Sequence, residues 1–292
     1  MSTANPLAAE FVETFREAAT SADPDLATPA LLIARVGYPR LEPATHLAHL
    51  HDMGKAAAKR LSLGEGPDTT QGPIDTLNRY LFEEQGFAGN TTEYEDPRNS
   101  FLNQVLERRT GIPITLAVVY IEVARRAGVR VDGVNFPGHF LLRFPFGPDD
   151  DHAGAVFVDP FHRGAVMSDT DCRALLRQHA GGAVAFEPRM LAPATKLQIL
   201  VRMLSNLKRI YVGMRSFQQG LALTELLLSI EPSALNELRD RGLLAYHLND
   251  FTTALRSLEA YLRFAHAEPG QDDRSEVWRH VKALRRRVAS LN

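Results

Sequence analysis

The stretch GIPITLAVVYIEVARRAG, residues 111–128, decides how this chain folds. Its apolar side chains surround nearly the whole helical circumference, and Glu122 and Arg126, four residues apart, form a thin polar face. We expect the helix to begin at Pro113, where a missing N–H costs nothing, and to end at Gly128. Because a helix that is apolar almost all round is normally buried on most sides, this segment predicts the central helix of a domain.

After this helix the apolar pattern changes to that of strands. We expect strands at residues 129–136, 139–144 and 155–159. Three strands after a buried helix predict an α+β core with an antiparallel sheet. If the last two strands pair so that opposed residue numbers sum to 298, His139 lies opposite Asp159, with the two Cβ atoms about 4.5–5.5 Å apart. This register shows that the two side chains can meet, and other registers stay open.

The chain before the central helix is also predicted to be helical. Residues 1–62 carry apolar side chains at helical spacing, interrupted by Pro39 and Pro43. Residues 74–85 and 101–109 resume the same spacing after a loop rich in glycine and proline. We therefore expect a helical N-terminal region that leads into the α+β core.

From Lys196 onward the pattern is purely helical and repeats itself. Phe217 maps onto Phe251, and Gly220 maps onto Ala254, each 34 residues further along. A period of 34 with small and aromatic residues at these offsets resembles the tetratricopeptide repeat. Because two repeats are fewer than the three usually needed for stability, we expect them to stack on the first domain or on the last helix. The apolar stripe expected on that last helix consists of Trp278, Val281, Leu284, Val288 and Leu291.

Composition and charge exclude several classes of protein. The 292 residues are 45% hydrophobic and 23% charged with a net charge of -2, so we expect no strongly basic nucleic-acid surface. No apolar run approaches the roughly 18–20 residues needed to span a bilayer, and the first residues lack the pattern of a secretory signal. One cysteine, Cys172, excludes an internal disulfide and a multi-cysteine zinc site. We therefore expect a cytoplasmic protein without a membrane partner.

Three ordered segments resemble the SirB-type branch of the transglutaminase-like superfamily. They are NSFLNQVLERRTGIPITLAVVYIEVARRAGV (residues 99–129), FPGHFLLRF (136–144) and VFVDPF (156–161). The resemblance implies a papain- or transglutaminase-like core with a helical N-terminal region and C-terminal tetratricopeptide repeats. We expect a transglutaminase-like domain over residues 1–192, with a helical region over residues 1–62 and a core over about residues 74–164. Tetratricopeptide-like helical repeats are expected over residues 193–292.

The resemblance also implies a catalytic frame that has lost its nucleophile. A cysteine hydrolase or acyltransferase needs a thiol at a helix N-terminus, an imidazole base and a carboxylate that orients the imidazole. The superfamily histidine falls at His139 and the aspartate at Asp159, but the cysteine position holds Pro113, which cannot form a thioester. Cys172 follows Asp159 in the chain, in the wrong order to replace the missing cysteine. We therefore expect a non-catalytic binding or regulatory protein, a pseudoenzyme, that docks a protein or peptide partner through its repeats.

The alternative is a hydrolase or acyltransferase that uses a hydroxyl. Thr115, one turn into the central helix, would be the nucleophile, and His139 would be its base, held by Asp159. Thr115 falls on the same side as the thin polar face, so we expect that it need not point into the core. Asn99 and Asp96 are the further polar residues expected near this helix start.

Three other patterns each allow a structural and a functional interpretation. His46, His49 and His51 lie close together in the sequence, and helical spacing puts His46 and His49 on one face. Zinc would need a third ligand and a tight geometry there, so we expect neither a metal nor a cofactor. Cys172 lies near a predicted helix start, where a thiol can be acidic, although a lone cysteine is more often a small buried side chain. The basic run on the last helix, which we interpret as a solvated face and not as a nucleic-acid surface, is formed by Arg279, Lys282, Arg285, Arg286 and Arg287.

Overall fold

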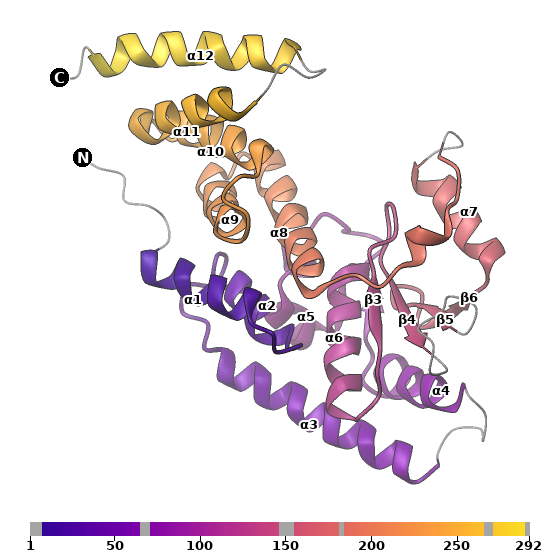
Figure 1. Ribbon diagram of the computed structural model, residues 1–292. Helices are drawn as coiled ribbons and strands as arrows, with labels where there is room; N and C mark the ends of the chain where they lie inside the picture. The colour runs from indigo at the N-terminus through magenta and orange to yellow at the C-terminus, as the bar shows by residue number, and fades with distance from the viewer. Residues whose placement is uncertain (1–7, 65–70, 146–154, 181–183, 266–270, 290–292) are drawn as a thin grey trace. The chain divides into compact units, whose positions relative to one another are not determined.

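A computed structural model describes residues 8–64, 71–145, 155–180, 184–265 and 271–289 of the chain (Figure 1). The chain divides into two compact units. One unit combines Met1–Ser21 with Leu204–Asn292, and the other consists of Ala22–Met203. Each unit has its own hydrophobic core and is described by itself. Among the described residues, no helix is both long enough and apolar enough to cross a membrane.

The unit Ala22–Met203 contains short helices, one long helix and two small sheets. Its helical elements are α2 (Ala27–Ala34), α3 (Pro43–Ser62), α4 (Gly72–Asn78), the π-helical turn η1 (Arg79–Glu84), the 3-10 turns η2 (Pro97–Asn99) and η4 (Pro188–Leu191), α5 (Leu102–Arg108), α6 (Pro113–Arg126), α7 (Asp169–Ala180) and the start of α8 (Lys196–Gly213). Its strands are β1 (Ala88–Gly89), β2 (Thr110–Gly111), β3 (Asp132–Val134), β4 (Leu141–Pro145), β5 (Ala155–Asp159) and β6 (Ala165–Met167).

The main sheet is antiparallel, with strand order β3-β4-β5-β6, and the predicted α+β core is confirmed. Leu142 pairs with Val158, so opposed residue numbers sum to 300, and the predicted sum of 298 is wrong. The reason is a turn before β4, in which the His139 N–H donates to the Phe136 carbonyl at 3.1 Å. Because side chains alternate along a strand, a shift of two residues keeps Asp159 on the predicted face.

The helix α6 is the centre of this unit and packs against α3, α5, β3 and β4. Every residue from Pro113 to Ala124 is buried, as the all-round apolar pattern predicts. The predicted thin polar face is wrong, because Glu122 is completely buried. Its carboxylate accepts the Leu26 N–H at 2.9 Å and pairs with the guanidinium groups of Arg125 and Arg126. A buried carboxylate is tolerated here because two cations and a backbone donor replace its water.

The second unit contains the repeats. Its helices are α1 (Ala9–Thr20), the remainder of α8, α9 (Phe217–Ile230), α10 (Leu235–His247), α11 (Phe251–Phe264) and α12 (Gln271–Ala289). The predicted period of 34 is confirmed, since α9 and α11 begin 34 residues apart. The turns that precede them match as well, because Arg215 and Asn249 both adopt a left-handed backbone, with φ of 58° and 62°. Where α10 packs against α11, a Cβ on Gly242 would lie 2.5 Å from the side chain of Leu258.

Helices at both ends of the chain complete the repeat unit. The helix α1 packs against α9, although the sequence places it before the transglutaminase-like core, and α12 packs against α11. Val281 and Leu284 of the predicted apolar stripe on α12 are buried as expected, but Val277 is buried in place of Trp278. Trp278 is 43% exposed and lies beneath the cations of Lys282 and Arg285. The side chain of Val288, and Leu291 as a whole, lie outside the described residues.

Candidate functional site

His139 is held by a tight turn between β3 and β4. The turn passes through Gly138, whose φ of 73° is a left-handed conformation that favours glycine. A Cβ at Gly138 would lie 2.3 Å from the Cβ of His179 in α7, so only glycine leaves room for that helix. As a result His139 is 5% exposed and its ring is fixed in position.

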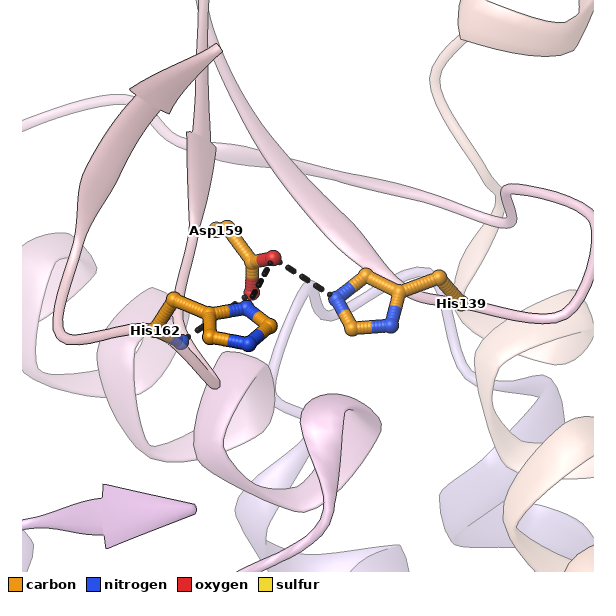
Figure 2. Close-up of side chains that lie close together, drawn as sticks. All are labelled: His139, Asp159 and His162. Atoms are coloured by element: carbon orange, nitrogen blue, oxygen red, sulfur yellow. Dashed lines mark hydrogen bonds and ion pairs between the residues drawn. The ribbon is translucent and has the colours of Figure 1, made fainter. Parts of the chain in front are cut away.

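Asp159 is the last residue of β5, and its carboxylate joins two histidines (Figure 2). Oδ2 lies 2.9 Å from Nε2 of His139 and 2.8 Å from Nδ1 of His162. Oδ1 accepts the backbone N–H groups of Phe161, at 2.9 Å, and of His162, at 3.3 Å. The sequence therefore predicts the His139–Asp159 pairing that the structure contains, but it misses His162.

The carboxyl group of Asp159 is electrostatically stabilised as an anion. Burial alone would raise the pKa of Asp159, but the hydrogen bonds and charges of His139 and His162 outweigh it and lower the pKa below its usual value. Partial burial and the neighbouring His139 also lower the pKa of His179, which disfavours its charged form. The site therefore combines one ionised carboxylate with several imidazoles.

The loop between β5 and β6 carries His162 and is fastened to the central helix. Gly164 has a φ of 77°, and its carbonyl accepts a hydrogen bond from the side chain of Asn78 at 2.8 Å. Tyr120, which is buried in α6, donates its hydroxyl proton to Asn78 at 3.0 Å. A side chain at Gly164 would collide with Asn78, so the tight turn and the asparagine fit only together. His162 is thus held on a short, anchored turn and remains accessible.

The imidazole rings form a stack around His139. The ring of His162 lies 6.1 Å from it at an angle of 24°, and the ring of His179 lies 5.7 Å away at 22°. Phe161 contacts His139 edge-on at 6.2 Å and contacts Tyr94 at 6.0 Å. This aromatic chain connects the His–Asp pair to the segment that follows β1.

The other half of the predicted catalytic frame is the start of α6. The Thr115 side chain is fully buried there, so the expectation that it need not point into the core is wrong. Its hydroxyl lies 2.6 Å from the carbonyl of Asn99 and 3.1 Å from that of Ile112, and it accepts the Ile112 N–H at 3.2 Å. Among the described residues, no hydrogen bond joins Thr115 to His139. The use of Thr115 as a nucleophile stays a prediction.

Asn99 and Asp96 brace the loop before α5. The side-chain amide of Asn99 donates to the Glu93 carbonyl at 2.6 Å, and its oxygen accepts from Asn90 at 3.2 Å. Asp96 pairs with Arg98 at 2.7 Å. In the portion of the chain that the structure describes, neither residue is hydrogen-bonded to the His–Asp pair, so their contacts are those of a folded loop.

The other candidate residues from the sequence are His46, His49 and Cys172. His46 bonds Glu107 at 2.9 Å, and the described residues bring no third ligand to His46 and His49. Cys172 is completely buried against the sheet. Burial, reinforced by nearby carboxylates, raises the pKa of Cys172 to about 11, so the possibility of an acidic thiol at this helix start is wrong.

The residues that sequence reasoning misses are His162 and His179. His162 has a local signal, because Asp159-Pro160-Phe161-His162 is a turn sequence that places the histidine three residues after the aspartate. His179 has none, because it reaches the site only through the packing of α7 against the turn at Gly138. The site thus contains more imidazoles than the superfamily frame requires.

Comparison with known families agrees with this arrangement. Residues 44–205 match the transglutaminase-like superfamily, and residues 207–286 match the tetratricopeptide repeat. The fold and the His–Asp pair therefore define a transglutaminase-like core followed by helical repeats. The chain belongs to the SirB-type branch of the transglutaminase-like superfamily, and the predicted resemblance is confirmed.

Relatives of this chain occur in bacteria and animals. The UPF0162 protein of Xylella fastidiosa is 40% identical over 243 residues, which cover 82% of this chain and 83% of that protein. The UPF0162 protein of Vibrio cholerae is 28% identical over 199 residues, which cover 68% of this chain and 72% of that protein. F-box only protein 21 of Mus musculus is 31% identical over 68% of this chain, which corresponds to 32% of that longer protein.

Proposed function

We propose that this protein is a non-catalytic binding or regulatory protein built on a transglutaminase-like domain. The observation that carries this proposal is the start of α6. Pro113 occupies the position where the superfamily has its cysteine, and the nearest hydroxyl, on Thr115, is buried among backbone groups. A nucleophile must reach both its base and its substrate, and a hydroxyl enclosed in this way reaches neither.

The His139–Asp159 pair has a structural role in this proposal. It connects the turn before β4, the end of β5 and the loop that carries His162. Buried polar groups that are fully hydrogen-bonded fix one arrangement of the surrounding chain. The pair therefore braces the end of β5 against the turn before β4 and shapes the polar surface at which His162 is accessible.

The repeats supply the partner-binding half of the proposal. Tetratricopeptide arrays present extended surfaces to other proteins. Within the repeat unit, Met214 and Trp278 are large apolar side chains that are 58% and 43% exposed. A protein or peptide partner would cover such side chains. The location of the protein in the cytoplasm stays a prediction.

Intact-protein mass spectrometry tests the non-catalytic half. The full chain is incubated with activated acyl donors and serine/threonine-reactive probes, alongside Thr115→Val and His139→Ala. We expect no adduct that depends on these residues. An adduct that maps to Thr115 and disappears in both variants would contradict the proposal and establish the hydrolase or acyltransferase alternative.

Site-specific photo-crosslinking in cells tests the binding half. A photo-reactive amino acid replaces Met214 or Trp278 in the full chain, and replacement of Leu63 in the other unit is the matched control because that side chain is 63% exposed. We expect the same partner to be captured from both repeat positions and not from the control. Capture from Leu63 alone, or from no position, would contradict docking through the repeats.

A further inference from the structure

The His–Asp pair belongs to a three-residue group with the composition of a metal site. Nε2 of His139, Nδ1 of His162 and a carboxylate oxygen of Asp159 all lie within 4.8 Å of one another. Figure 2 shows the two imidazoles converging on the carboxylate from its two sides. We propose that these three residues bind a divalent transition-metal ion of the zinc type. This inference goes beyond the proposed function and does not depend on it.

The donor set and its spacing match the chemistry of such an ion. Zinc binds imidazole nitrogen and carboxylate oxygen at about 2.0–2.2 Å, so two tetrahedral ligands lie about 3.3 Å apart. The two nitrogens are now 2.9 and 2.8 Å from Oδ2 of Asp159. Replacing the two shared protons by one ion thus requires the two nitrogen–oxygen distances to increase by about half an ångström, and His162 is the ligand whose exposed side chain can move.

The surroundings already hold the three ligands in orientation. Oδ1 of Asp159 is occupied by two backbone N–H groups, which directs Oδ2 toward the imidazoles. Hydrogen-bonded partners behind the ligands are a recurrent feature of metal sites, because they fix ligand orientation. The loop of His162 is tied to Asn78, and the turn of His139 is packed against α7 at Gly138.

The site is closed on one side and open on the other. The side chains of His139 and Asp159 are almost fully buried, whereas that of His162 is 60% exposed. An ion can therefore enter from the side of His162 without opening the core. Three protein ligands leave one tetrahedral position for water or for a group on a partner, an arrangement seen in open zinc sites and not in closed structural ones.

Metal titration of the full-length, untagged chain tests this inference. The chain is dialysed against a chelator and titrated with Zn²⁺ by calorimetry and with Co²⁺ by visible absorption. We expect about one ion per chain and the intense spectrum of tetrahedral Co²⁺. The decisive variant is His162→Ala, with His162→Gln as a second variant, because this exposed residue can be changed without opening the core. His51→Ala, in which an exposed histidine of α3 is removed, is the matched control.

We expect both changes at His162 to weaken binding at least about tenfold, while His51→Ala binds as the wild type does. Circular dichroism of each variant establishes that the fold is intact. The absence of an equivalent of bound ion, or equal affinity in His162→Ala and the wild type, would overturn the inference. So would binding that is lost in His51→Ala. None of these results affects acyl transfer or partner capture, so failure here and failure of the proposed function are distinguishable.

Discussion

The two halves of the catalytic frame differ in what their polar groups do. At the start of α6, Pro113 supplies no nucleophile and the hydroxyl of Thr115 is used by three backbone groups. At the end of β5, His139 and Asp159 share a side-chain hydrogen bond at 2.9 Å, and His162 adds a third polar group that is exposed. One half is an ordinary helix start, while the other contains groups that can bind or transfer a proton.

This difference shows what folding requires of each half. The helix start tolerates proline because the first turn of a helix has no N–H partner to lose. The end of β5 cannot lose Asp159 in the same way, because two imidazoles and two backbone N–H groups are hydrogen-bonded to it. Folding alone therefore accounts for the His139–Asp159 pair, and the His162 side chain next to it is exposed.

The largest expected effect is that of Asp159→Ala. Removing this buried carboxylate leaves four hydrogen-bond donors without their acceptor, so we expect a loss of about 3 kcal/mol in the free energy of unfolding. Urea denaturation measures it, and Asp52→Ala, on the exposed side of α3, is the control with an expected change below about 0.5 kcal/mol. Equal free energies of unfolding for the two variants would show that the hydrogen bonds of Asp159 at the end of β5 do not stabilise the fold.

The next effect concerns the one thiol of the chain. With a pKa of about 11, Cys172 is mostly protonated at pH 8, and its thiolate fraction increases only as the pH approaches that value. We expect iodoacetamide to modify it at least about a hundredfold more slowly in the folded chain than in urea, since the thiolate is the reactive form. Rapid modification of the folded chain at pH 8 would instead make Cys172 a candidate nucleophile.

A smaller effect is expected at the start of α6. Thr115→Val keeps the size of the side chain but removes the buried hydroxyl, so we expect a loss of about 1.5 kcal/mol in the free energy of unfolding. Thr115→Ser retains the hydroxyl and is the matched control, with a smaller loss. Chemical denaturation measures the free energy of unfolding of both variants. If Thr115→Val were as stable as the wild type, the hydroxyl would have no structural role, and a chemical role would gain weight.

The smallest effect is expected for His162→Ala in the metal-free chain. The side chain is 60% exposed, and ion pairs at such positions contribute little, so we expect a change within about 0.5 kcal/mol. Thermal unfolding in the presence of a chelator measures it. A loss as large as that of Asp159→Ala would mean that His162 braces the loop and is not available to a ligand.

The periodic segments and the His139–Asp159 pair could be predicted from the sequence, but the strand register and the other members of the site could not. The central helix and the 34-residue repeat follow from local patterns of apolar residues, and both are present in the structure. The register of β4 and β5 differs by two residues because the turn at Gly138 delays the strand, which no strand pattern reveals. His179 is brought to His139 by the packing of α7 across the sheet, a contact between residues 40 positions apart. The burial of Thr115 does not follow from the helix pattern either, because the loop at Asn99 covers its side of α6.

If the His139–Asp159 pair and the start of α6 still form one frame, a thiol restored at position 113 is activated by His139. The most direct measurement is the pH dependence of alkylation at position 113 in Pro113→Cys, with and without His139→Ala, with peptide mapping to separate the new thiol from Cys172. A thiol at a helix N-terminus beside an imidazole has a pKa lowered to roughly 3.5–7.5. We expect a reactive thiol at neutral pH that becomes at least about tenfold less reactive when His139 is removed. A thiol that titrates at its ordinary value, or whose reactivity does not depend on His139, would show that the two halves no longer form one frame.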